Sequence, residues 1–180
     1  MDIITLYHGT IYDFNTIDLN RGKPFKDFGR GFYVSRTDSQ AERIAIRNRN
    51  FENDLLVENG NNPTARAWVY TYEFDADSLN RLKVKEFIKP GEEWVRFVVM
   101  NRSNRKQQHD YDIVIGPTAN DDTNVVVQAF LNRVFGDINS ELAIRTFLQY
   151  ILPDKLPNQM FFGTTRAVSL LRYIERRALL

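Results

Sequence analysis

Two segments within the first 35 residues contain side chains that suit ligand binding. The first, Leu6–Thr10, ends a short apolar run with His8 and Gly9, and the second places Tyr33 after the glycine-flanked Arg30. A neutral histidine hydrogen-bonds a hydroxyl group, and tyrosine offers an aromatic plane to a cationic ring. Arginine is always charged and forms paired hydrogen bonds with phosphate. Together the two segments suit a ligand that carries hydroxyls, a ring and phosphate.

In this order the two segments resemble the first two catalytic segments of the ADP-ribosyltransferase superfamily. The similarity is to its His-Tyr-Glu branch, as in the poly(ADP-ribose) polymerases, which has a His-Gly-Thr strand end and a Gly-basic-Gly-aromatic-Tyr segment. The chain looks most similar to an uncharacterised bacterial family, catalogued as a domain of unknown function and assigned to this superfamily. The resemblance runs through most of the chain and is carried by residues 6–10, 26–35, 68–70, 112–117 and 159–162.

The resemblance implies a binding site for NAD⁺ and no metal. The residues expected to bind the dinucleotide are His8, Gly9, Thr10, Arg30, Gly31 and Tyr33. His8 would hydrogen-bond a ribose hydroxyl, the backbone of Gly9 would hold the nicotinamide carboxamide, and Tyr33 would stack on the nicotinamide ring. Arg30 is the candidate phosphate partner, and Gly31 lets its loop pass close to the ligand.

The third catalytic position departs from the pattern of the branch. Where the superfamily usually has Glu on a late strand, this chain has Gln159 in Asn-Gln-Met-Phe-Phe, so the expected catalytic set is His8, Tyr33 and Gln159. A glutamine accepts a hydrogen bond from the ribose 2′-hydroxyl, but it supplies neither a full negative charge nor a general base. We therefore do not expect polymer synthesis.

The resemblance implies a mono-ADP-ribosyltransferase that transfers ADP-ribose from NAD⁺ to a macromolecule, protein or nucleic acid. Families of this kind often occur in bacteria as toxins paired with an antitoxin protein, or as phage-defence factors. Two other functions remain open. The chain could be an NAD⁺ glycohydrolase, or a catalytically inactive module that binds NAD⁺ or ADP-ribose, for which the missing Glu is the argument.

Each of these residues also has a purely structural explanation. Taken alone, His8 fits a histidine satisfied by backbone groups, Tyr33 a strand core residue, and Arg30 a solvated charge. Asp121 and Asp122 could form a metal or ribose site, but they better fit the charged N-terminus of a helix that begins near residue 125. His109 has no evident partner set.

Composition narrows the functional class. The 24 basic and 23 acidic residues give a net charge of +1, which argues against a general polyanion-binding surface. The chain has no cysteine, which excludes disulfides and thiolate chemistry, and it has only two histidines. No apolar run approaches the roughly 20 residues of a membrane-spanning helix. The acidic start, Met-Asp-Ile-Ile-Thr, is unlike a signal peptide, so the cytoplasm is the expected compartment.

The elements that position these residues follow from hydrophobic periodicity and turn residues. We expect strands at 3–8, 32–35, 67–74, 82–87, 112–115 and 159–163. We expect helices at 37–50, after Pro90-Gly91 through Trp94 to Asn101, at 126–134, at 140–151 and at 165–179. The last is expected to have a solvated face of Arg172, Arg176 and Arg177. Residues 52–65 are polar and contain Asn-Gly and Pro, which predicts a loop.

The order of these elements favours an α+β fold over a doubly wound sheet, because strands and helices do not alternate. A length of 180 residues fits a single domain spanning 1–180. The resemblance refines this to an ADP-ribosyltransferase-like split β-sheet core with flanking helices.

Overall fold

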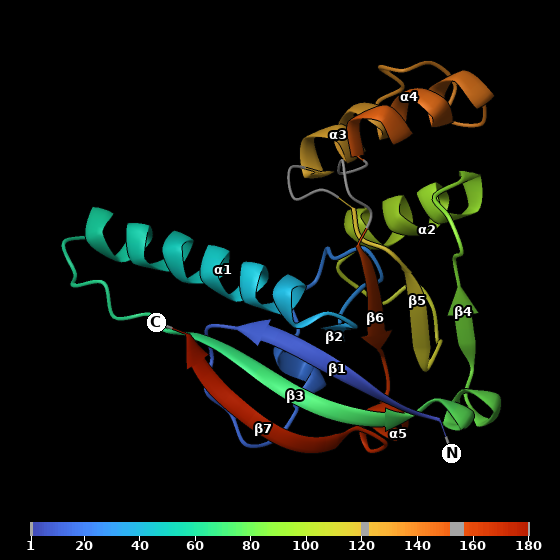
Figure 1. Cartoon of the computed structure of the whole chain (residues 1–180). Coiled ribbons are helices and arrows are strands. Elements are labelled where there is room, and N and C mark those ends of the chain that lie inside the picture. The colour runs from blue at the N-terminus through green and yellow to red at the C-terminus, as the bar shows by residue number, and fades with distance from the viewer. Residues whose placement is uncertain (1, 120–122, 152–156, 180) are drawn as a thin grey trace. The chain divides into compact units, whose positions relative to one another are not determined.

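The computed structural model describes residues 2–119, 123–151 and 157–179. It has mixed α+β architecture (Figure 1) and divides into two compact units. The first unit comprises residues 1–17, 33–82 and 165–180, and the second comprises residues 18–32 and 83–164. The expectation of an α+β fold is confirmed, and that of one domain over the whole chain stays a prediction.

The first unit contains an antiparallel sheet with the strand order β2-β1-β3-β7. Its elements are β1 (Ile3–Thr10), β2 (Phe32–Ser35), α1 (Asp38–Glu58), β3 (Ala67–Asp75), η2 (Ala76–Arg81), α5 (Thr165–Val168) and β7 (Arg172–Leu179). β1 and β3 pair along their whole length, with His8 opposite Tyr70 and Gly9 opposite Val69. Because side chains alternate across a strand, His8 and Tyr70 lie on one face of the sheet and Gly9 and Val69 on the other.

Helix α1 packs on β1 and β3, on the face that carries Gly9. The prediction of a loop from residue 52 was wrong, because the helix continues to Glu58. It ends at an Asn59-Gly60 pair in which Gly60 has φ 76°, and the amides of Gly60 and Asn61 bond to the carbonyls of Val57 and Leu56. This is a Schellman termination, which needs a glycine at the left-handed position. The Asn-Gly signal therefore marks the end of a helix rather than the middle of a loop.

The last element is a strand, and the predicted helix at 165–179 was wrong beyond the short α5. β7 completes the sheet by pairing with β3, which overrides the helical propensity of its Arg, Ala and Leu residues. Its arginines are also not a wet helix face, since each pairs with an acid of the first unit. Arg172 pairs with Glu73, Arg176 with Asp13, and Arg177 with Asp38 and Glu42.

In the described residues of the second unit, the strands follow the order β4-β5-β6 and helices accompany them. Its elements are η1 (Leu19–Arg21), β4 (Val84–Glu86), α2 (Glu92–Ser103), β5 (Ile113–Pro117), α3 (Thr123–Leu131), α4 (Glu141–Ile151) and β6 (Asn158–Phe162). β5 runs parallel to β4 and antiparallel to β6. α2, α3 and α4 pack on one another, and the rings of Phe130 and Phe147 lie 4.9 Å apart. Asp121 and Asp122, the possible helix start, lie outside the described residues.

The core of the second unit is aromatic around Phe28, whose ring lies within 6.5 Å of the rings of Phe87, Phe97 and Phe161. Trp94 of α2 is fully buried and donates its indole N–H to the carbonyl of Pro117 at 3.2 Å. Aromatic pairs of this kind stabilise a core beyond the area they bury. This packing fixes α2 and the end of β5.

Candidate functional site

The expected site residues fall into two groups, one in each unit. His8, Gly9, Thr10 and Tyr33 belong to the first unit, and Arg30, Gly31 and Gln159 belong to the second. The structure brings His8 and Tyr33 into contact within the first unit.

His8 is bonded directly to the backbone of Tyr33. Its Nδ1 lies 2.7 Å from the Tyr33 carbonyl oxygen. A carbonyl only accepts, so Nδ1 is the protonated nitrogen and Nε2 of the neutral ring is an acceptor. The pairing follows from the sheet, because β1 and β2 are antiparallel neighbours with Tyr7 opposite Ser35. This tautomer is the one that can accept a hydrogen bond from a hydroxyl group at Nε2.

The surroundings of His8 are aromatic. Its ring lies edge-on to Phe14, at 5.9 Å, and to Tyr70, at 6.4 Å, and these two rings stack on each other at 4.2 Å. Burial lowers the pKa of His8 to about 4, and the hydrogen bond to the Tyr33 carbonyl opposes this only in part. His8 is therefore neutral at neutral pH, which agrees with the tautomer assigned from its geometry.

The loop that follows β1 is tied to the same face of the sheet by hydrogen bonds. The amide of Phe14 donates to the Tyr70 hydroxyl at 2.7 Å, and the amide of Tyr12 donates to the Thr10 hydroxyl at 3.2 Å. Arg176 of β7 pairs with Asp13 at 2.6 Å. The Tyr70 hydroxyl also lies 3.1 Å from Asp13 Oδ1 and from the Phe14 carbonyl oxygen, to which it can donate. Burial raises the pKa of Tyr70, which keeps this donor protonated. Thr10 thus orders the loop beside His8.

Gly9 allows helix α1 to pack closely against β1 because it has no side chain. A Cβ added there would lie 1.9 Å from the carbonyl oxygen of Ala41, a residue of the first turn of α1 that is itself buried. No side chain fits this spacing, so the glycine is required for α1 to approach β1. This packing role explains the His-Gly pair independently of any ligand.

In the second unit the Lys26–Gly31 segment is fixed by Gln107. The amide of Arg30 donates to the Gln107 side-chain oxygen at 2.8 Å, and Gly29 has φ 85°, a conformation that favours glycine. A Cβ at Gly31 would meet the Phe161 ring at 2.2 Å. Both glycines are therefore explained by local packing and backbone conformation, and Arg30 between them is half-buried.

Gln159 lies on β6 and bonds to a buried carboxylate. Its Nε2 donates to Oδ2 of Asp27 at 2.7 Å, and the amide of Ala119 donates to the same oxygen at 2.9 Å. The other oxygen, Oδ1, accepts from Nε of Arg102 at 2.7 Å and from its Nη2 at 2.6 Å. The side chains of Asp27 and Arg102 are 4% and 8% exposed. An ion pair this buried fixes both partners and, through Oδ2, the amide of Gln159.

Sequence reasoning did not identify Asp27, Arg102, Phe14 or Tyr70 as part of either group. Asp27 and Arg102 are 75 positions apart, and neither stands in a motif. Tyr70 is 1% exposed, and its hydroxyl accepts a hydrogen bond from the Phe14 amide of the loop. The one sequence feature that pointed to Asp27 is its position directly before Phe28-Gly29, and an acid in such a place is too common to identify a site.

Low pH is expected to destabilise the protein through His8. Because the pKa is about 4 in the folded state and about 6.5 in the unfolded state, only the unfolded chain takes up this proton between the two values. Stability is therefore full above about pH 6.5 and falls as the pH is lowered toward 4, by about 2 kcal/mol at pH 5. Urea unfolding of the wild type and of His8→Gln at pH 8 and pH 5 measures this contribution.

The matched control is His109→Gln. Burial also lowers the pKa of His109, whose Nε2 lies 2.8 Å from the Phe28 carbonyl, so this variant should lose its own smaller contribution and keep that of His8. A His8→Gln protein with the same loss between pH 8 and pH 5 as the wild type would contradict the burial of His8.

The described part of the chain shows neither a metal-binding cluster nor a membrane-spanning helix. Within residues 2–119, 123–151 and 157–179, no group of three or more His, Asp or Glu side chains could hold a metal ion. None of the helices that the structure describes is both long and apolar enough to span a membrane.

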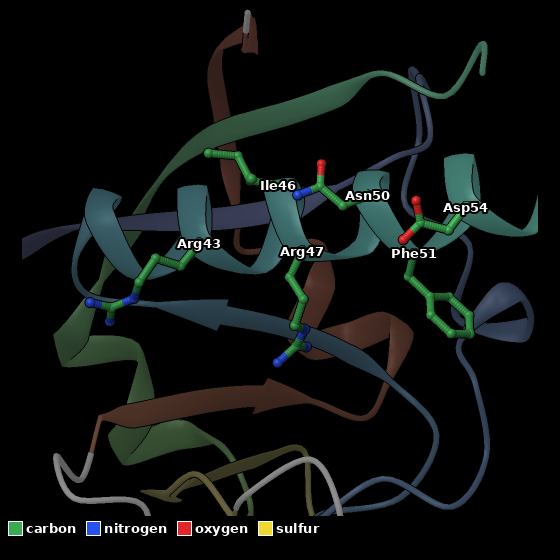
Figure 2. Close-up of a pocket in the computed structure, with 6 residues that line it drawn as sticks. All are labelled: Arg43, Ile46, Arg47, Asn50, Phe51 and Asp54. Carbon is green, nitrogen blue, oxygen red and sulfur yellow. The ribbon is translucent and has the colours of Figure 1, made fainter.

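A shallow hollow of about 470 Å³ lies on the outer surface of α1. It is lined by Arg43, Ile46, Arg47, Asn50, Phe51 and Asp54. Figure 2 shows that Arg43, Arg47 and Phe51 project from the same side of the helix, as their spacing of four residues requires. Burial lowers the pKa of Arg47. The lining mixes both charges with apolar groups and selects no one ligand, so we assign it no role.

These features define an α+β protein with a histidine–tyrosine pair on neighbouring strands and a buried carboxylate beneath a late-strand glutamine. The chain belongs to the family described as protein of unknown function (DUF3990), which it matches over residues 4–173. No match was found among curated proteins or among solved structures.

Proposed function

We propose that this protein is an NAD⁺-dependent mono-ADP-ribosyltransferase that modifies a macromolecule, protein or nucleic acid. The observation that carries the proposal is the neutral His8, whose Nδ1 is bonded to the Tyr33 carbonyl and whose Nε2 is the acceptor nitrogen. That form suits a ribose hydroxyl, and the neighbouring Tyr33 ring suits a cationic nicotinamide. Cleavage of the nicotinamide–ribose bond needs the dinucleotide held in one orientation, which a rigid sheet provides.

In this proposal the residues act as follows. His8 accepts from a ribose hydroxyl, the Gly9 backbone binds the carboxamide, and Tyr33 stacks on the nicotinamide ring. Thr10 orders the loop beside His8, and Arg30 and Gly31 bind the phosphates. Gln159 accepts from the 2′-hydroxyl through its amide oxygen. A bacterial toxin with a cytoplasmic target and an antitoxin partner remains the setting we propose for this activity.

A second candidate is a catalytically inactive module that binds NAD⁺ or ADP-ribose. It is favoured by Gln159, whose amide is neutral and whose nitrogen is already bonded to Asp27, so it cannot take a proton from an acceptor. NAD⁺ glycohydrolase activity is a third outcome, since water needs no bound acceptor. Product analysis separates the three.

Tyr33→Ala is expected to weaken NAD⁺ binding at least about tenfold in isothermal titration, because the variant removes the ring. It leaves the carbonyl that holds His8 unchanged, so the effect reports on the ring alone. The control is Phe51→Ala, which removes an exposed aromatic ring of the first unit and should bind NAD⁺ as the wild type does. Loss of binding in Phe51→Ala but not in Tyr33→Ala would move the site to the α1 hollow.

Incubation of the wild type with NAD⁺ and cell extract then identifies the reaction. Nicotinamide release with ADP-ribose attached to a macromolecule supports the transferase, and free ADP-ribose supports the hydrolase. Binding without nicotinamide release supports the inactive module. A wild type that binds no NAD⁺ at millimolar concentration would overturn the whole proposal.

A further inference from the structure

We infer that Asp27 is the positioning residue of the Gln159 amide and thereby makes position 159 a hydrogen-bond acceptor toward ligand. The ligand half of this inference rests on the proposed function. The orientation half rests on contacts within the second unit alone. Asp27 itself is 4% exposed and touches the ligand in no step; it acts through Gln159.

The orientation follows from what a carboxylate can do. The carboxylate of Asp27 receives hydrogen bonds from two nitrogens of Arg102, from the Ala119 amide and from Gln159. With the cation beside it, the carboxylate is an acceptor only, so the Gln159 atom at 2.7 Å must be the amide nitrogen. The amide oxygen, Oε1, then points away from Asp27. Gln159 is half-buried on β6, so this oxygen is presented at the partly exposed end of the side chain.

The ion pair with Arg102 determines whether Asp27 acts on a ligand through its charge or through the orientation of Gln159. Asp27 and Arg102 are in contact and together neutral, so the pair adds little net field at the position of a ligand. Its effect is geometric, because two buried and mutually bonded side chains cannot rotate without breaking several hydrogen bonds. An acceptor held in this way selects a hydroxyl donor, and in the proposed function that donor is the ribose 2′-hydroxyl.

The orientation is tested with Gln159→Glu, which leaves Asp27 and Arg102 in place. At neutral pH the variant sets a second carboxylate against Asp27, and its melting temperature should fall by about 5 °C or more. At about pH 4 the introduced group is protonated and donates to Asp27 as the amide did, so the difference from the wild type should shrink. In this test Asp27 is the charged group bonded to position 159, and Arg102 is the cation bonded to the other oxygen of Asp27.

The matched control is Gln149→Glu, an exposed position on α4 that receives the same change of charge. It should melt as the wild type does at both pH values. A Gln159→Glu protein that is as stable as the wild type at pH 7 would overturn the assigned orientation.

The role toward ligand is tested with Asp27→Asn and with the double variant Asp27→Asn/Gln159→Glu. The introduced asparagine has one oxygen, which the two N–H groups of Arg102 attract, so its NH₂ group takes the place of Oδ2 and faces Gln159 and the Ala119 amide. The Gln159 amide then turns over, accepts from this NH₂ group and presents its nitrogen toward ligand. NAD⁺ affinity should then fall at least tenfold. In the double variant the introduced carboxylate accepts from the asparagine and again presents an oxygen, so affinity should return to within about threefold of the wild type. A purely structural role of Asp27 predicts no such rescue.

The outcomes separate the two proposals. Folded Asp27→Asn with wild-type NAD⁺ affinity overturns the positioning role. If Asp27→Asn does not fold, Gln159→Glu decides the orientation, and Gln159→Leu decides the acceptor role, since unchanged affinity in that variant would refute it. If the wild type binds no NAD⁺, the proposed function and the ligand half fail, while the melting difference of Gln159→Glu still decides the orientation.

Discussion

Arg102→Ala is expected to destabilise the protein by about 3–5 kcal/mol. The variant removes the cation from Asp27 and leaves a carboxylate that is 4% exposed with only two neutral donors, the Ala119 amide and the Gln159 side chain. An uncompensated buried charge is far more costly than the loss of the attraction itself, because water cannot replace the missing partner. Urea unfolding at pH 7 gives the free energy directly.

The control for this prediction is Arg96→Ala, on the same helix. Arg96 pairs with Glu92 one turn away, and their side chains are 40% and 61% exposed, so its loss should cost no more than about 0.5 kcal/mol. Asp27→Ala/Arg102→Ala should cost less than the sum of the two single variants, because it removes both charges. Similar effects of Arg102→Ala and Arg96→Ala would contradict the burial of the Asp27–Arg102 pair.

Local sequence signals predicted most of the strands and the starts of most helices. β2 has its expected bounds at 32–35, and β3 extends the expected 67–74 by one residue. These segments have clear alternation and sharp turn residues at their ends, so local preference and the folded sheet agree. Of the aromatic stripe Trp68, Tyr70, Tyr72 and Phe74, which alternation predicts as core, the last three are buried and Trp68 is half-buried. The opposite face is also buried at Ala67 and Val69, so β3 is not the half-buried strand that the alternation indicated.

The two elements that were mispredicted depend on partners distant in the chain. The C-terminal segment contains good helix formers and becomes β7 because β3 offers a free edge about 100 residues earlier, where Arg172 lies opposite Glu73. The second half of α1 has its apolar residues spread around the helix rather than along one face, so it lacks the apolar stripe that identifies a helix; these residues are Phe51, Leu55, Leu56 and Val57. Hydrophobic periodicity indicates which face of an element is buried, so an element that buries little of its surface shows little periodicity.

In the candidate site, too, local sequence predicted some features and contacts distant in the chain determined the others. His8, Tyr33 and Gln159 were identified because their residue types and order match a motif. The contacts that set their chemistry come from residues with no motif, namely Phe14 and Tyr70 around His8 and Asp27 beside Gln159. A sequence can name the groups that meet a ligand, but their tautomer, protonation and orientation depend on neighbours that only the fold supplies.

Gly9→Ala is expected to be among the most damaging single-methyl additions in the chain, at about 3 kcal/mol or more. The new Cβ would lie 1.9 Å from the Ala41 carbonyl oxygen, which is backbone and cannot rotate away, so α1 would have to shift from β1. Gly91→Ala is the control, since its φ is −162° and no atom lies within 4 Å of the added Cβ. As the N-cap of α2 it should cost no more than about 1 kcal/mol.

The Gly9 variant also separates packing from ligand binding at the His8–Gly9 pair. If the glycine served only a ligand, Gly9→Ala would unfold in urea as the wild type does and lose only NAD⁺ affinity. The close contact with Ala41 predicts a stability loss in the absence of any ligand, and unfolding without NAD⁺ measures it. A folded, fully stable Gly9→Ala protein would show that α1 does not approach β1 this closely. Ligand binding would then be the remaining explanation for a glycine at this position.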